Sequence, residues 1–262
     1  LVGVWLMAAS GDPARRATCL RYAGGVALVQ VYWVLAFVLV GTHSPFFVWA
    51  FAVGAIAELS VPVVAERSGQ TVWHRHHIIE RYALLNIIVL GEGLLSVVLA
   101  LRAVEEVGSR YSPSSLGVAL AAAVTSFALW GIYFAEEESL AGDDNRSAFV
   151  WGYGHLLVFA AGAAVGPGFE AIVDLLGEHA EVPLRAGIMA IAVPVAVYFL
   201  AVWFVRDRPA LPPAGRSVLP LGALAVLAAG AVVPTAFAVG AVAIAAAATA
   251  AARTIYSGMR SA

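Results

Sequence analysis

Residues 77–92, H-I-I-E-R-Y-A-L-L-N-I-I-V-L-G-E, decide how the rest of the chain is interpreted. The stretch begins polar, turns apolar at Tyr82 and ends on a carboxylate, Glu92. Steps of three or four residues separate five of its side chains, which a helix places on one face: His77, Arg81, Leu84, Ile88 and Glu92. An ionisable residue at membrane depth is costly and is by default a candidate functional group. The first question is therefore whether this helix lies in lipid.

The composition is that of a membrane protein. Hydrophobic residues make up 61% of the chain, charged residues 12%, and the mean hydropathy is +0.88. Soluble domains are closer to about half apolar and about a quarter charged. The apolar runs are continuous rather than alternating, which favours an all-α, polytopic transmembrane helical bundle over a β-barrel. The net charge of −2 indicates no nucleic-acid partner.

Apolar runs predict about eight complete spans, given that a spanning helix needs about 20 residues. Residues 1–9 read as the remaining end of a further helix, so we expect the chain to be N-terminally incomplete. Residues 218–252 are too long for one span, and Pro234 lies close to their middle. We interpret them as a hairpin of two helices, the alternative being one long kinked helix. The remaining predicted spans are 24–40, 45–64, 81–101, 116–134, 148–168 and 184–205.

Polar segments separate these spans and set the predicted orientation. The segments 10–22, 102–115, 136–146, 170–182 and 206–217 are expected to be loops. If residues 10–22 are cytoplasmic, alternation also places 65–81, 135–149, 206–217 and the C-terminus in the cytoplasm. Of the fifteen basic residues, all Arg, only Arg102, Arg110 and Arg185 then fall on the opposite side. Because cytoplasmic loops carry the excess of Arg and Lys, this count supports the alternation.

Two acids lie inside consecutive predicted spans, Glu58 in the second and Glu92 in the third. We expect these helices to be neighbours, so that both carboxyl groups face a common interior. Burial and a second carboxyl both favour the protonated form, so such a pair would share a proton or recruit a cation. The alternative is structural, with each acid a protonated group that joins two helices by a hydrogen bond worth about 1 kcal/mol. Gln30 and Asn86 are further candidates for hydrogen bonds between helices.

A histidine-rich segment precedes the third span and contains His74, His76, His77 and Glu80. His76 and Glu80 are spaced for one side of a helix, which suits two metal ligands. Arg81, however, occupies the place where the zinc-protease pattern H-x-x-E-H needs its second His. We therefore interpret the segment as the wet start of a helix and predict no metal ligand and no cofactor. Arg81 is expected to reach the cytoplasmic surface or to pair with Glu80 or Glu66.

The candidate polar core also takes in a histidine of the fifth span, as a possible proton-handling group. Its members are Glu92, Glu58, His77, Glu80, Arg81 and His155. The sequence shows neither the nucleophile motif G-x-S-x-G nor a Gly-rich phosphate loop, and its single cysteine, Cys19, has no second cysteine to pair with. No catalytic residue is predicted.

The motif H-x-x-E-R-x-x-L at 77–84, continuing to Leu90-Gly91-Glu92, resembles the signature of the bacterial low-temperature-requirement protein A family. Further matches are Glu58-Leu59 with Pro62, Trp130-x-x-Tyr133-Phe134 and Gly154-His155, and the likeness covers the chain from Leu1 to the C-terminus. The resemblance implies a polytopic protein of the bacterial inner membrane. Family members usually begin with a helix bearing an E-L-F-F-D type motif, which this chain lacks.

We therefore expect a single integral membrane domain over residues 1–262 that moves a small ion or solute and is not an enzyme. Its partners would be the lipid bilayer and a small ion or proton. One alternative is a non-transporting scaffold for membrane adaptation, in which Glu58 and Glu92 only join helices. The other is a membrane-embedded enzyme that acts on lipid through residues 74–80.

Overall fold

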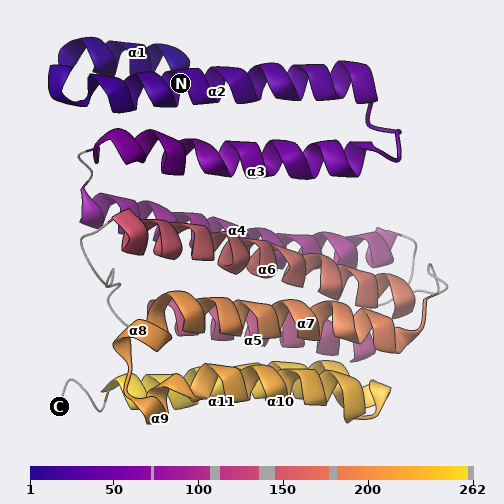
Figure 1. The fold of residues 1–262 in the computed structure, drawn as a ribbon. Coiled ribbons are helices and arrows are strands. Elements are labelled where there is room, and N and C mark those ends of the chain that lie inside the picture. The colour runs from indigo at the N-terminus through magenta and orange to yellow at the C-terminus, as the bar shows by residue number, and fades with distance from the viewer. Residues whose placement is uncertain (72–73, 107–112, 136–144, 177–181, 259–262) are drawn as a thin grey trace. The chain divides into compact units, whose positions relative to one another are not determined.

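The computed structural model describes residues 1–71, 74–106, 113–135, 145–176 and 182–258, although the side chains of 96, 99–106, 113–115 and 257–258 lie outside the description. All regular structure in these ranges is helical (Figure 1), which confirms the predicted all-α class. The chain forms two compact units, Leu1–His74 and Arg75–Ala262. The prediction of a single membrane domain remains a prediction.

The first unit consists of α1 (Val2–Gly11), α2 (Arg16–Leu35) and α3 (Phe47–Ala65). Short turns extend two of these helices: α2 continues as the π-helical η2 (Ala36–Val40) and α3 as the 3-10 turn η3 (Glu66–Ser68). The 3-10 turn η1 (Pro13–Arg15) links α1 to α2, and Asp12 caps it by accepting the N–H groups of Ala14 and Arg15. The predicted loop 10–22 is therefore wrong, because one capped turn suffices to reverse the chain and the helix resumes at Arg16.

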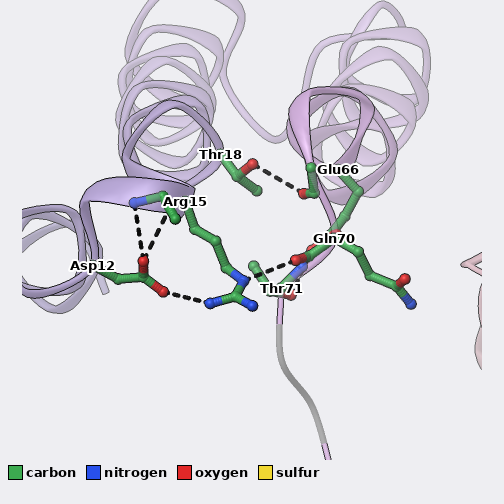
Figure 2. A network of polar contacts seen from close by, with 8 residues as sticks. Asp12, Arg15, Thr18, Glu66, Gln70 and Thr71 are labelled. Carbon is green, nitrogen blue, oxygen red and sulfur yellow. Dashed lines mark hydrogen bonds and ion pairs between the residues drawn. The ribbon is translucent and has the colours of Figure 1, made fainter.

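Polar contacts join the ends of these helices (Figure 2). The Arg15 guanidinium bonds Asp12 at 2.6 Å and donates from Nε to the carbonyl of Gln70. This guanidinium holds the pKa of the Asp12 carboxyl below its usual range. The buried Thr18 hydroxyl donates to the carbonyl of Gly69, and the Glu66 carboxylate accepts the Thr71 hydroxyl at 2.6 Å. The residues just after α3 are thereby fixed to the start of α2.

The second unit is a bundle of long helices: α4 (Arg75–Glu106), α5 (Pro113–Phe134), α6 (Asn145–Leu176), α7 (Leu184–Val202), α10 (Val218–Val232) and α11 (Thr235–Gly258). The π-helical turn η4 (Trp203–Asp207) and the short helices α8 (Arg208–Ala210) and α9 (Pro213–Arg216) connect α7 to α10. α6 packs between α4 and α7, α7 also packs on α10, and α11 packs on α10 and α5. Apolar side chains fill the interior between these helices, among them Leu129, Ile132, Val158, Ile191 and Phe199.

The hairpin predicted for 218–252 is confirmed, and the alternative of one kinked helix is wrong. α10 ends at Val232, and the next residue, Val233, is extended because it precedes Pro234. The last carbonyls of α10 have no partner within the helix. Arg185 supplies one, since its guanidinium donates to the carbonyls of Gly230 and Val233 at 2.5 and 2.8 Å.

Seven helices of the described chain are long and apolar enough to cross a membrane: Pro13–Val40, Phe47–Ser68, Leu116–Phe134, Asn145–Leu176, Leu184–Ala210, Pro213–Val232 and Thr235–Tyr256. The predicted span 81–101 lies within α4, part of whose side chains are outside the description, and it is not among the seven. Several helices run past their apolar cores. α4 begins at Arg75, and α6 ends at Leu176, so Glu170 and Asp174 lie on a helix and not in the predicted loop. Of the predicted loop 136–146, residues 136–144 lie outside the described part of the chain.

Candidate functional site

The predicted face of α4 exists as an exposed stripe on the second unit. All five of its residues, His77, Arg81, Leu84, Ile88 and Glu92, are exposed, with Leu84 at 54% and Ile88 at 65%. The opposite face is buried in the bundle through Asn86, Leu90 and Val97. The helical spacing therefore grouped these residues correctly. They lie on the side of α4 that faces away from the interior of this unit.

Glu92 has no hydrogen bond or ion pair to any residue that the structure describes. Its direction is fixed by its neighbour Gly93, which packs against Gly166 of α6. A Cβ atom on Gly166 would lie 2.6 Å from the Cα atom of Gly93, so the two backbones are in contact at this point. Such close helix pairs are typical of small residues in membranes. Because Gly93 faces α6, the adjacent Glu92 side chain is held on the exposed side of α4.

Three exposed side chains form a local cluster at the start of α4: His77, Glu80 and Arg81. Nε of Arg81 donates to Nε2 of His77 at 3.2 Å, and Nδ1 of His77 lies 3.8 Å from a Glu80 carboxylate oxygen. The side chains of His77 and Glu80 are 62% and 57% exposed. Arg81 is exposed, and its partner is His77 rather than Glu80 or Glu66. That this surface is the cytoplasmic one stays a prediction. Among the described residues, no three His, Cys, Asp or Glu side chains gather as a metal site would need.

Glu58 lies on α3, in the first unit, and its side chain is exposed there. One of its oxygens accepts the indole N–H of Trp33 at 3.1 Å. Glu58 and Glu92 thus belong to different units, and the common interior proposed for the two acids stays a prediction.

His155 is fully buried at the centre of an aromatic cluster. Its Nδ1 lies 2.8 Å from the carbonyl of Trp151, and this nitrogen carries a proton because a carbonyl can only accept. Its Nε2 lies 3.0 Å from the hydroxyl of Tyr133, and the rings of Trp151 and Tyr82 pack against the imidazole. Both ring nitrogens are therefore engaged in the interior of the bundle, away from the exposed stripe of α4.

Two buried arginines adjoin this cluster, and the sequence did not predict them as site residues. The guanidinium of Arg253 donates to both carboxylate oxygens of Asp207, at 2.6 Å for the shortest bond, and each side chain is 1% exposed. The same guanidinium donates to the carbonyl of Ile132, and that of Arg206 to the carbonyl of Tyr133. The ends of α5, α7 and α11 and the start of α6 thus meet at one end of the unit, as the predicted alternation requires.

The π-helical turn explains how two charged neighbours become buried. Val205, Arg206 and Asp207 of η4 are all buried, whereas a regular amphipathic helix would expose part of such a run. Gly154 of α6 makes room for the turn, since a Cβ atom there would overlap the Val205 side chain. The motif Gly154-His155 therefore places a glycine against η4 and a histidine into the aromatic cluster. The sequence did hold a signal for the Asp207–Arg253 pair. The two residues have opposite charges and follow two spans that end on the same predicted side of the membrane.

The interhelical bond expected for Asn86 is present, whereas Gln30 is exposed and its side chain bonds no residue that the structure describes. Nδ2 of Asn86 donates to the Tyr198 hydroxyl at 2.9 Å, and that hydroxyl contacts the carbonyl of Leu129 at 3.4 Å. This chain of contacts links α4, α7 and α5 in the bundle core.

Residues 1–251 match the family described as Bacterial low temperature requirement A protein (LtrA). No curated protein and no solved structure matches the chain.

Proposed function

Because this chain belongs to the bacterial low temperature requirement A protein (LtrA) family and its helices suit a polytopic membrane protein, we propose that it moves a small ion or solute across the bacterial inner membrane. Glu92 is the central polar group of the proposed path. Glu58 is proposed as a second acid on that path, and the C-terminus is proposed to lie in the cytoplasm.

The observation that carries this proposal is the contrast between the exposed Glu92 and the buried polar groups of the second unit. Asp207 is paired with Arg253, and Asn86 with Tyr198. Glu92, in the apolar part of α4, has no such partner among the described residues. An acid at the centre of a membrane helix costs about 2.5–3.5 kcal/mol on insertion scales. Binding a proton or a cation neutralises the negative charge of the Glu92 carboxylate. An ion path requires a group of this kind, which can bind and release a proton or a cation.

The sharpest test compares Glu92→Gln with wild type in proteoliposomes, at equal reconstitution, with and without a pH gradient. Gln has the shape of protonated Glu and cannot release a proton or hold a cation by charge. We expect ion flux from wild type and its loss in Glu92→Gln. Glu170→Gln is the matched control, because Glu170 is an exposed acid near the end of α6 and its change should leave flux intact.

The second candidate function is a non-transporting scaffold for membrane adaptation. The Asp207–Arg253 pair favours it, since this chain does use buried polar groups as joints between helices. Well-folded wild type that shows no flux with several ions and both gradient directions would overturn the transport proposal and leave the scaffold. Flux that survives in Glu92→Gln would remove Glu92 from the path.

A further inference from the structure

A pocket of about 450 Å³ opens where α6 begins and η4 passes into α8. Its lining combines two arginines, Arg146 and Arg208, with apolar side chains, among them Val150, Trp151, Val205 and Pro209. The volume lies within the range of about 300–1,000 Å³ that small-molecule sites occupy. The proposed path at Glu92 does not include this pocket.

The charge of the pocket favours an anion. Arg146 comes from the first turn of α6 and Arg208 from the first residue of α8, so two separate elements bring positive groups to one cavity. Both side chains are exposed, and Arg208 lies over the ring of Phe204 at 5.6 Å, which orients its guanidinium. The amide groups at the start of a helix add a partial positive charge on the same side.

Apolar side chains make up most of the rest of the pocket wall. Trp151 is among them and is 4% exposed. The rest of the lining, Val150, Val205 and Pro209, is apolar and suits the glycerol and upper acyl region of a lipid.

The position of the pocket selects among anions. It lies at the ends of helices that can cross a membrane, where lipid headgroups lie, and tryptophan is typical of that level. Basic pockets between membrane helices bind anionic headgroups. We propose that this pocket binds the phosphate of an anionic phospholipid between Arg146 and Arg208.

The test is native mass spectrometry of the full chain in detergent, titrated with phosphatidylglycerol or phosphatidylcholine. We expect phosphatidylglycerol to be retained preferentially. Arg146→Ala and Arg208→Ala should each weaken its binding roughly fivefold, and the double variant roughly twenty-fivefold. The matched control is the double variant Arg16→Ala/Arg67→Ala, which removes two exposed arginines from the first unit and should bind like wild type.

A second variant separates the pocket from general surface charge. Val150→Trp fills the cavity and keeps both arginines, so it should also weaken phosphatidylglycerol binding, while Arg146→Lys/Arg208→Lys should retain most of it. Unchanged binding in the Ala double variant or in Val150→Trp, with the fold verified by circular dichroism, would overturn the proposal. Inorganic phosphate that displaces the lipid at equal concentration would also overturn it, because the site would then recognise a free anion.

Discussion

At the scale of single residues, the Asp207–Arg253 pair is the most exacting feature of the structure. Both side chains are 1% exposed, and the carboxylate receives both Nε and an outer nitrogen of the guanidinium. Removing two charges from water is costly, and only good geometry with further hydrogen bonds offsets that cost. The bond from Arg253 to the Ile132 carbonyl is such an addition and ties the pair to α5.

We predict that Asp207→Ala lowers the free energy of unfolding by about 3–5 kcal/mol, because it leaves the Arg253 charge buried without its counter-charge. Titration with SDS, followed by circular dichroism, measures this loss. The double variant Asp207→Leu/Arg253→Met removes both charges and should recover most of the stability. A loss below about 1 kcal/mol in Asp207→Ala would show that water reaches the pair.

The sequence identified Glu92 and His155 as polar groups within apolar runs, and it overlooked Asp207 and Arg253. Those two charges follow the apolar core of their spans, where hydropathy cannot distinguish a wet loop from a buried helix end. In the predicted orientation Arg253 is simply one of the arginines on the cytoplasmic side. Only the pairing of two helix ends far apart in the chain reveals that it is buried.

At the scale of elements, the contact of Gly93 with Gly166 determines how closely α4 approaches α6. We predict that Gly166→Ala lowers the free energy of unfolding by about 1–3 kcal/mol, because its Cβ atom would meet backbone and force the helices apart. SDS titration again provides the measurement. Gly131→Ala is the matched control, since a Cβ atom there has no neighbour within 4 Å and should cost nothing. Equal effects of the two variants would contradict the close approach.

The elements were predicted well where an apolar run or a proline defines them, and less well at their ends. Pro234 marked the division between α10 and α11. The helix starts at Arg16 and Arg75 were missed, because polar residues continue a helix beyond its apolar core whenever a cap or a tertiary contact holds them. Hydropathy detects the apolar part of a helix that lies in lipid and not the full length of the helix.

At the scale of the whole molecule, the predicted orientation can be tested with single cysteines in a Cys19→Ser background. Gln70→Cys and Ser217→Cys should lie in the cytoplasm and Thr42→Cys on the opposite side, and all three parent residues are exposed. We expect an impermeant maleimide to label Thr42→Cys in intact spheroplasts and the other two only after permeabilisation. The reverse pattern would invert the orientation, and labelling of Gln70→Cys and Ser217→Cys from different sides would contradict the alternation.

The packing of helices against one another is the part of the fold that hydropathy predicts least. Adjacent spans are expected to pack as neighbours, with Glu58 beside Glu92. Because α3 and α4 belong to different compact units, that pairing stays a prediction. Within each unit the contacts are specific, as the Tyr32 hydroxyl bonded to the Ala50 carbonyl at 2.6 Å shows for α2 and α3. Hydropathy alone carries no such information about which spans pack together.

The π-helical turn Trp203–Asp207 has a consequence for chain length. A π turn holds one more residue than an α turn, so it is equivalent to a one-residue insertion in α7. Deleting one residue there would restore α geometry and rotate the following side chains by about 100°. Asp207 would then leave Arg253, and Arg208 would leave the pocket. A surface loop accepts a change of one residue at little cost, whereas this segment, whose last two residues fall in the predicted loop 206–217, does not.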